Sequence, residues 1–140
     1  MSQPAGPPQA ILETSIYAAD IDAAEAFYRD VFGLAVVRRL EGKFCFLRCG
    51  EQMLLVFNPE ESARLDARNP VPRHGAQGPG HVCFRAGNAD EIDRWRERFL
   101  SLGLAIEHDH VWPGGGRSVY IRDPAGNSIE VAESRIWKLP

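Results

Sequence analysis

A histidine stands at the start of an apolar strand in the stretch GPGHVCFRAGNADEIDRW, residues 78–95. His81 begins this strand, and Val82 and Phe84 alternate behind it. An imidazole at such a place is either a packed core residue or one ligand of a metal ion. The choice depends on whether other ligand-type side chains stand at matching places elsewhere in the chain.

Two glutamates are the other candidates for this chemistry. Glu13 lies in the strand-like segment ILETSIYA, and Glu130 interrupts the apolar run SIEVA near the C-terminus. A buried carboxylate without a partner is costly, so Glu130 requires a cation or a network of hydrogen bonds. Glu13 is compatible with a ligand, and also with an ordinary polar residue near the start of a strand.

The first half of the chain has the periodicity of a strand, a helix and three further strands. The segment DIDAAEAFYRDVFGL predicts a helix that begins at Asp20 or Asp22 and ends at Gly33. Strands are predicted before it in ILETSIYA and after it in AVVRRLE, KFCFLRCG and EQMLLVFN. The polar segment 59–80, rich in proline and glycine, predicts a connector.

The second half repeats this order. GHVCFRA predicts a strand, NADEIDRWRERFLSLG a helix capped by Asn88 or Asp90, and LAIEHDH, RSVYIRD and NSIEVAE three more strands. Glu13 and His81 are 68 residues apart, and the offset between matching residues grows to 76 towards the C-terminus. Such a drift indicates small loop insertions in a duplicated βαβββ unit.

Strand parity places the candidate ligands on one side of the predicted sheets. The apolar residues that alternate with Glu13, His81 and Glu130 are expected to face the helices, so these three side chains point away from them. A four-stranded sheet covered by a helix on one face and curved on the other forms half of a cup. Two such halves make one concave site.

These segments resemble the vicinal oxygen chelate superfamily, which includes glyoxalase I, fosfomycin-resistance transferases, bleomycin-binding proteins, methylmalonyl-CoA epimerase and extradiol dioxygenases. DIDAAEAFYRDVFGL resembles the first-helix signature of that superfamily, and RSVYIRDPAGNSIEV resembles its terminal hairpin. The resemblance extends from about Ile11 to Glu133. It implies an α+β fold of two βαβββ modules that form paired half-cups, and a homodimer. The fold hosts metalloenzymes of several classes and also metal-free binding proteins.

The resemblance also implies a set of ligands. Carried over residue by residue, the ligand positions are Glu13 and His81 at the starts of the modules, and Leu54 and Glu130 in their last strands. Leu54 and Glu130 are 76 residues apart, as are Gly50 and Gly126. Because leucine cannot bind a metal, the pattern departs from four-ligand glyoxalase I and is closer to the three-ligand layout of fosfomycin-resistance enzymes and dioxygenases.

One imidazole and two carboxylates, without a thiolate, suit Mn²⁺, Fe²⁺, Ni²⁺, Co²⁺, Zn²⁺ or Mg²⁺ rather than a structural zinc. Such an ion polarises neighbouring oxygens of a chelating substrate and holds an enolate or alkoxide as charge develops. We therefore expect lyase or isomerase chemistry first, and thiol transfer or dioxygenation next. The competing hypothesis is a metal-free protein that sequesters an antibiotic or another aromatic ligand.

Four further side chains are predicted to contact the substrate: Ser15, Tyr17, Arg48 and Tyr120. Ser15 and Tyr120 fall where the resemblance to fosfomycin-resistance enzymes implies hydroxyl groups that contact substrate. Arg48 shares a strand face with Phe44 and Phe46, which predicts an aromatic-lined pocket with one anion anchor, or alternatively an ion pair at the surface.

The remaining histidines and loops are expected to be structural or solvated. His74 lies in the connector and is predicted to be a solvated loop residue rather than part of a lid. His108 and His110 share a strand face. Because no third ligand is evident nearby, both are predicted to be surface residues. The segment WPGGGRS lacks the strand-to-helix context of a phosphate loop and predicts a flexible turn.

Composition excludes several classes of function. The formal net charge of −3 gives no basic footprint for nucleic acid, and no apolar run approaches the ~20 residues of a membrane span. The N-terminus has no signal-peptide pattern. Three cysteines argue against a disulfide framework and for a reducing, cytoplasmic compartment, with all three expected as buried small residues.

The sequence thus predicts a homodimeric, divalent-metal enzyme that acts on a small substrate with vicinal oxygens. Residues 1–10 are expected to form a disordered lead-in and residues 11–136 one domain. Its first module is predicted at about residues 11–58, the connector at about 59–78, and the second module at about 79–136.

Overall fold

The computed structural model describes residues 3–140, and residues 1 and 2 of the predicted lead-in lie outside this range. The first module consists of β1 (Glu13–Tyr17), α1 (Ile21–Phe32), β2 (Ala35–Leu40), β3 (Phe44–Cys49) and β4 (Gln52–Phe57). The second consists of β5 (His81–Ala86), α3 (Ala89–Ser101), β6 (His108–Val111), β7 (Arg117–Arg122) and β8 (Ser128–Glu133). A short helix, α2 (Pro59–Ser62), lies in the connector, and a 3₁₀ helix (Ser134–Trp137) follows β8.

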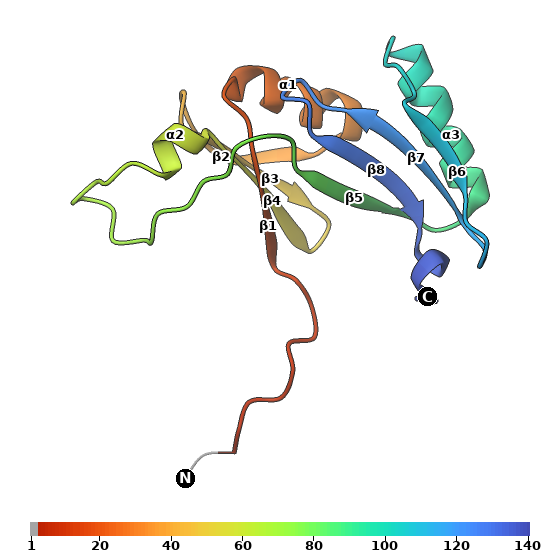
Figure 1. Ribbon diagram of the computed structural model, residues 1–140, viewed down its shortest axis with the longest axis horizontal. Coiled ribbons are helices and arrows are strands. Elements are labelled where there is room, and N and C mark those ends of the chain that lie inside the picture. The colour runs from red at the N-terminus through yellow and green to blue at the C-terminus, as the bar shows by residue number, and fades with distance from the viewer. Residues whose placement is uncertain (1–2) are drawn as a thin grey trace.

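Each module folds into one four-stranded mixed sheet (Figure 1). The strand orders are β1-β4-β3-β2 and β5-β8-β7-β6, with the first pair of each sheet parallel and the other pairs antiparallel. The prediction of two βαβββ modules is confirmed. β1 and β5, which carry Glu13 and His81, are therefore edge strands of their sheets.

Local signals fix where the two long helices begin. The Asp20 side chain accepts a hydrogen bond from the backbone amide three residues later at 3.0 Å, so Asp20 rather than Asp22 caps α1. Asn88 rather than Asp90 caps α3 in the same way, at 2.9 Å. Gly33 ends α1 with a φ of 69°, a left-handed conformation that favours glycine. These caps fix the first residues of both helices and the last turn of α1.

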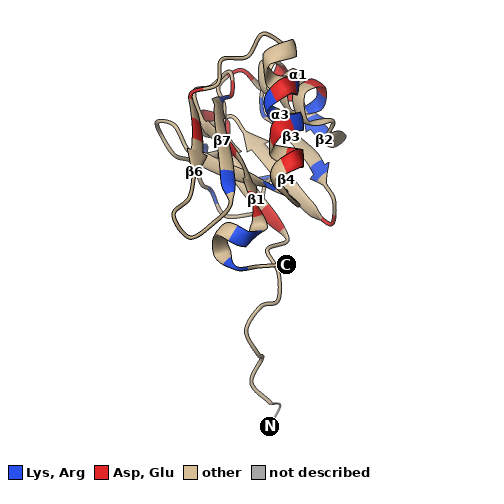
Figure 2. Cartoon of the chain, turned by 90° about the vertical axis from the view of Figure 1, so that its right-hand side faces the viewer, with Lys and Arg blue, Asp and Glu red and all other residues tan. Residues whose placement is uncertain are grey.

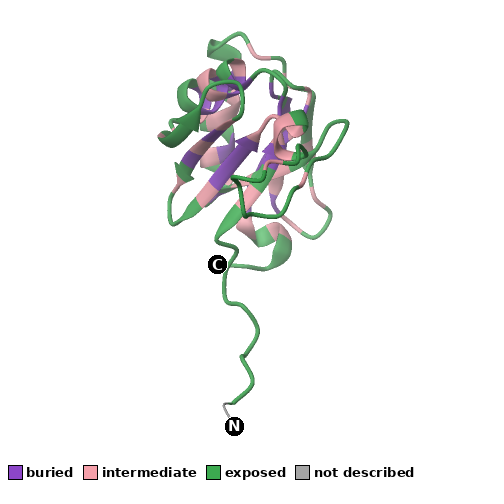
Figure 3. Ribbon diagram, turned by 90° about the vertical axis from the view of Figure 1, so that its left-hand side faces the viewer, coloured by how far each residue is buried: buried purple, intermediate pink, exposed green. Residues whose placement is uncertain are grey.

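The apolar faces of both modules meet in one hydrophobic core. Phe32 at the end of α1 lies with its ring centroid 4.4 Å from that of Phe84 on β5 and 5.2 Å from that of Trp95 on α3. The Tyr28 hydroxyl donates to Asp123 Oδ2 at 2.6 Å, which joins α1 to the turn before β8. Figure 3 shows buried residues concentrated in the sheets and helices, while the connector and the N-terminal segment are exposed.

Charged residues of opposite sign lie close together on α1, as the red and blue segments of Figure 2 show, and several of them form ion pairs. Arg39 on β2 contacts Asp22 and Glu25 on α1 at 2.7 and 3.0 Å. Arg98 on α3 donates to the backbone carbonyls of Asp30 and Val31 at 2.8 and 2.7 Å. Exposed ion pairs such as Arg39–Asp22 contribute only about 0–1 kcal/mol each, so the stability of the fold rests mainly on the hydrophobic core.

Two segments differ from their sequence prediction. The connector contains the helix α2, which begins after the cap Asn58. β6 begins at His108, later than predicted, although Leu104 and Ile106 do pack against the core. Their alternation has the pattern of a strand, but the ladder with β7 begins only at His108.

No helix within residues 3–140 is long and apolar enough to cross a membrane.

Candidate functional site

We call the face of each sheet that points away from its helix the inner face. On the second sheet, β5, β8 and β7 place Cys83, Glu130 and Tyr120 directly side by side, because Glu130 is the register partner of both other residues. His81 lies two residues before Cys83 and therefore shares this face. Sequence parity predicted this arrangement correctly for His81, Glu130 and Tyr120.

His81 and Glu130 contact each other directly. His81 Nε2 lies 3.2 Å from Glu130 Oε2, and His81 Nδ1 lies 2.9 Å from the Ser128 backbone oxygen. The carboxylate side chain is only 8% exposed, whereas the imidazole is 49% exposed. The carboxylate is thus held inside the sheet, and the imidazole is open to a ligand on the inner face.

The hydrogen bond to Ser128 determines which nitrogen of His81 carries the proton. A backbone oxygen can only accept, so Nδ1 must be the donor, and the neutral ring then presents a lone pair at Nε2. That lone pair faces a carboxylate oxygen, which is also an acceptor. The contact of 3.2 Å is favourable only when a proton or a metal cation lies between the two atoms.

The separation of these two atoms fits ligands of one ion. Ligand atoms about 2.1 Å from a metal are roughly 3.0 Å apart at an octahedral angle and roughly 3.4 Å apart at a tetrahedral angle. The observed 3.2 Å lies between these values. A backbone oxygen that fixes the ring of a metal-binding histidine is also a common outer-shell partner. His81 and Glu130 therefore fit a divalent cation.

Tyr120 holds the other oxygen of the same carboxylate. Its hydroxyl donates to Glu130 Oε1 at 3.0 Å. Burial, and then the hydrogen bond and charge of Glu130, raise the pKa of Tyr120 to about 12. At neutral pH this phenol is a hydrogen-bond donor, so it orients Glu130 and cannot act as a general base.

Glu13 is not brought to this pair within one chain. It is exposed on β1, at the edge of the other sheet. Within residues 3–140, no three His, Cys, Asp or Glu side chains lie close enough together to hold a metal ion. The structure thus brings together two of the three predicted ligands, His81 and Glu130, and does not bring Glu13 to them.

The other predicted contact residues line the first sheet. The Tyr17 hydroxyl lies 2.7 Å from His74 Nδ1, and Ser15 is exposed on the same strand face. His74 also packs edge-on against Phe57, with ring centroids 4.5 Å apart. The prediction of a solvated loop histidine is therefore wrong, because the connector folds back onto this sheet. Arg48 is exposed, and its Nε donates to the Gly50 backbone oxygen at 3.0 Å.

An aromatic group continues along this inner face. Phe44 and Phe46 on β3 stack with ring centroids 4.3 Å apart, and Phe57 on β4 packs edge-on against Phe46 at 5.3 Å. These rings are half-buried. The prediction of an aromatic lining beside Arg48 agrees with this arrangement. The first sheet thus has an aromatic region on the β3 and β4 part of its inner face, whereas the second sheet carries Glu130 and Tyr120 there.

The position that corresponds to Glu130 is Leu55 rather than Leu54. Leu54 is 2% exposed and belongs to the hydrophobic core beneath the helix, so its side chain points away from the inner face. Leu55 lies opposite Ser15 and Phe46, as Glu130 lies opposite their counterparts Cys83 and Tyr120. The predicted equivalence was wrong by one residue, but an apolar side chain still occupies this corner.

Cys83 also departs from the prediction, because it is exposed and not buried. Partial burial of its thiol, and then the charge of Glu130, raise the pKa of Cys83 to about 12. The thiol is therefore protonated at neutral pH. Since the thiolate is the reactive form, Cys83 is not an activated nucleophile.

Two histidines that were predicted as surface residues extend the inner face of the second sheet. His108 is the register partner of Tyr120, and His110 is the partner of Ser118. His108 Nε2 lies 3.1 Å from His110 Nδ1. Their identical parity on one strand was visible in the sequence, but their position beside Tyr120 required the pairing of β6 with β7.

Comparison with known proteins identifies the family. Residues 10–131 match the model of the Glyoxalase/Bleomycin resistance protein/Dioxygenase superfamily. The chain belongs to this superfamily. The resemblance inferred from the helix and hairpin motifs is thereby confirmed, and the paired βαβββ modules agree with it.

Several solved structures of other proteins have the same fold as this chain. A lactoylglutathione lyase from Agrobacterium tumefaciens is 59% identical, with 96% of this chain and 100% of that chain covered and a TM-score of 0.94. A virulence protein from Salmonella typhimurium is 25% identical over 91% and 98% of the two chains, with a TM-score of 0.68. A glyoxalase/bleomycin resistance protein/dioxygenase from Nocardioides is 20% identical over 92% and 85%, with a TM-score of 0.71. The search of curated proteins found no match.

Proposed function

We propose that this protein is a divalent-metal-dependent enzyme that carries out lyase or isomerase chemistry on a small substrate with vicinal oxygens. The observation that carries the proposal is the contact of His81 Nε2 with Glu130 Oε2 at 3.2 Å, a separation that fits two ligands of one ion. A bound ion would supply Lewis acidity to neighbouring oxygens of the substrate. The name of the 59% identical lactoylglutathione lyase supports lyase chemistry over thiol transfer or dioxygenation.

The residues of the chain have distinct parts in this proposal. His81 and Glu130 hold the ion, and the Tyr120 hydroxyl fixes the Glu130 carboxylate through its 3.0 Å hydrogen bond. Glu13 is exposed on an edge strand, so it is accessible to a second molecule, and we propose that it completes the site of a partner subunit in a homodimer. Ser15, together with the aromatic inner face of the first sheet, then contacts the substrate from the opposite side of the cup.

The apolar side chain of Leu55 restricts which substrates the proposed site could convert. In four-ligand relatives this position is expected to hold a carboxylate that binds the ion and moves a proton. Leu55 can do neither, and Tyr120 remains protonated at neutral pH. We therefore propose little turnover of the glutathione hemithioacetal of methylglyoxal, which is the first substrate to assay because of the name of the Agrobacterium relative. Another substrate, or a metal-bound water, would have to supply the base.

The test is elemental analysis of protein purified without a metal-binding tag, beside the matched Glu130→Gln variant. The proposal predicts about one divalent ion per chain in the wild type that depends on Glu130. Removal of this ion by a chelator should lower the melting temperature of the wild type only, because a bound ligand stabilises the native state. A wild-type protein that is metal-free and cannot be loaded would contradict the proposal.

A second candidate function is metal-free sequestration of an aromatic ligand. The stacked rings of Phe44 and Phe46, 4.3 Å apart, favour it because flat ligands bind well against such faces. Glu13 and Glu130 would then attract a cationic group on the ligand. In a metal-free sample, this function predicts tight binding of a cationic aromatic compound that Phe46→Ala weakens. Binding that requires added metal would rule it out.

A further inference from the structure

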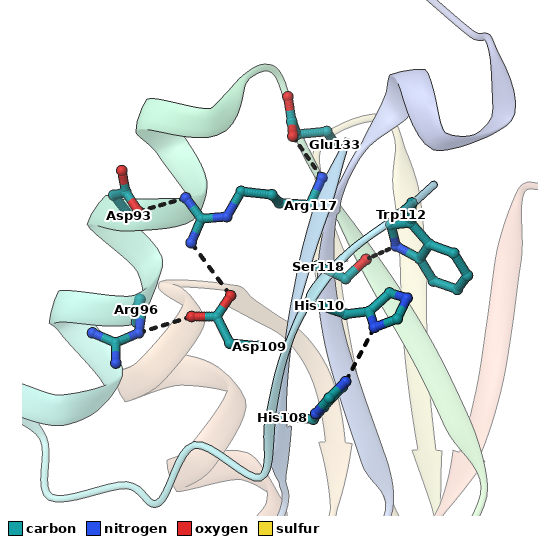
Figure 4. Close-up of polar contacts among 9 residues, drawn as sticks. All are labelled: Asp93, Arg96, His108, Asp109, His110, Trp112, Arg117, Ser118 and Glu133. Carbon is teal, nitrogen blue, oxygen red and sulfur yellow. Dashed lines mark hydrogen bonds and ion pairs between the residues drawn. The ribbon is translucent and has the colours of Figure 1, made fainter. Parts of the chain in front are cut away.

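His108 and His110 form a close imidazole pair on β6, an edge strand of the second sheet. They are separated by one residue on β6, so both side chains stand on the same face. Figure 4 shows the two rings on the side of β6 that points away from α3, with His110 next to Trp112 and Ser118. His108 is exposed and His110 is half-buried, so a ligand can reach the pair from solvent.

The two ring nitrogens that face each other have the separation of two ligands of one cation. His108 Nε2 and His110 Nδ1 are 3.1 Å apart. Only one proton can occupy the line between them, so the other nitrogen is an acceptor. A metal ion about 2.0–2.1 Å from both nitrogens requires a separation of roughly 2.8–3.4 Å, which the pair already has. Binding would therefore require small ring rotations rather than movement of the strand.

Neighbouring side chains hold the pair in place. The Trp112 ring packs edge-on against His110 with centroids 4.5 Å apart, and its indole Nε1 donates to Ser118 Oγ at 2.8 Å. The Tyr120 ring lies 6.1 Å from that of His108. These contacts reduce the side-chain entropy that would be lost when both rings bind one ion.

The opposite face of β6 anchors the strand itself. Asp109 lies between the two histidines and points towards α3 (Figure 4). Its carboxylate contacts Arg96 at 3.0 Å and Arg117 at 3.3 Å. Asp109 is therefore occupied by two guanidinium groups and is not a third ligand. The ligand set of the pair is purely imidazole, completed by water.

We propose that His108 and His110 form a second, chelating metal site that is separate from His81 and Glu130. Two neutral imidazoles favour Ni²⁺, Cu²⁺ or Zn²⁺ and discriminate against Mg²⁺ and Mn²⁺, which prefer oxygen ligands. With only two protein ligands the ion keeps open positions, so it exchanges readily and can accept an oxygen or nitrogen atom of a ligand in the cup. This inference does not rest on the proposed function.

The experiment is a Ni²⁺ titration of untagged protein by calorimetry, in a Glu130→Gln background that removes the first site. The variants added to this background are His108→Gln, His110→Gln and the double substitution. Because a chelate needs both rings, each single substitution should weaken Ni²⁺ binding by about 10-fold or more, and the double should add little. Glutamine is polar and these positions are accessible, so the variants should fold, as a thermal melt checks.

Nuclear magnetic resonance of the Glu130→Gln protein gives a second measurement, for which His108 and His110 are left unchanged. Added Zn²⁺ should shift the imidazole signals of His108 and His110 together and at the same concentration, while His74 serves as the control histidine. The proposal is overturned if single substitutions leave Ni²⁺ affinity unchanged or if their effects simply add in the double. It is equally overturned if Zn²⁺ shifts the two imidazoles independently.

Discussion

Leu55 lies on the inner face of the first sheet at the position that Glu130 occupies on the second. Each residue is paired with an aromatic residue on the next strand of its own sheet. Leu55 on β4 lies opposite Phe46 on β3, and Glu130 on β8 lies opposite Tyr120 on β7. The repeat thus places an apolar side chain where a fourth ligand could stand. Leu55, and not its neighbour Leu54, is therefore the residue that would limit the proposed metal site to three ligands.

The substitution Leu55→Glu should therefore tighten metal binding in the assembled dimer. In the metal-free protein it should lower stability by about 1–3 kcal/mol, because a carboxylate enters a position that is only 8% exposed. The measurements are metal affinity and the melting temperature of the apo form. Leu54→Glu is the matched control. It places the charge in the core, so it should cost about 3–5 kcal/mol and give no gain in metal affinity. Equal metal affinity in wild type and Leu55→Glu would contradict the assignment.

Alkaline pH should destabilise the protein through Tyr28. Burial, and then the charge and hydrogen bond of Asp123, raise the pKa of Tyr28 above its ordinary value of 10.0. The unfolded chain releases this proton above about pH 10 while the native protein keeps it, so stability is complete below pH 10 and falls as pH rises. The measurement is the melting temperature between about pH 8 and pH 11. Tyr28→Phe should melt lower at neutral pH but decline less steeply with rising pH. Parallel curves for the two proteins would contradict this account.

The loop between β6 and β7 should tolerate little change, in contrast to the flexible turn predicted from WPGGGRS. Gly116 has a φ of 96°, and a Cβ atom there would lie 2.6 Å from Ile136 Cγ2 in the 3₁₀ helix. Gly116→Ala should thus lose more stability than Gly42→Ala, which has a φ of 71° but open space around it. We expect about 1 kcal/mol for Gly42→Ala and about 2–3 kcal/mol for Gly116→Ala. Denaturant melts of both variants test this order, and equal losses would show that the 3₁₀ helix does not pack on the loop.

The proposed homodimer predicts complementation between two defective chains. Glu13→Ala and His81→Ala should each lose metal binding as pure proteins. In a mixture with free subunit exchange, half of the dimers contain both chains, and each mixed dimer has one intact site of two. About a quarter of the sites should therefore recover metal binding. Exchange is verified separately by mass spectrometry of differently labelled chains. Complete exchange without recovery would place Glu13 outside the site of the partner subunit.

Most of the fold could be predicted from the sequence, because its signals are local. The caps Asp20 and Asn88 and the glycine that ends α1 set the helices, and period-two apolar residues set the strands. The duplicated order of these elements then indicated the architecture. β6 was predicted too early because Leu104 and Ile106 pack against the core without pairing to a neighbouring strand.

The candidate site was predicted less completely, since it depends on register. The offset of 76 between Gly50 and Gly126 does not apply to the strands that follow, where Met53 and Ser128 are equivalent and 75 residues apart. A slip of one residue moves a side chain to the other face of a sheet, which exchanged Leu54 for Leu55. The pairing of His74 with Tyr17 likewise depends on how the connector folds back, and no local pattern specifies it.

If His81 and Glu130 hold a divalent ion, the protein should bind Mn²⁺ through these two side chains. Mn²⁺ accepts carboxylate and imidazole ligands but discriminates against the purely imidazole pair of His108 and His110. Electron paramagnetic resonance of free Mn²⁺ should show about one site per chain in the wild type, and this site should be lost in both His81→Gln and Glu130→Gln. A wild-type protein that binds no Mn²⁺, or binds it as well after either substitution, would contradict the account.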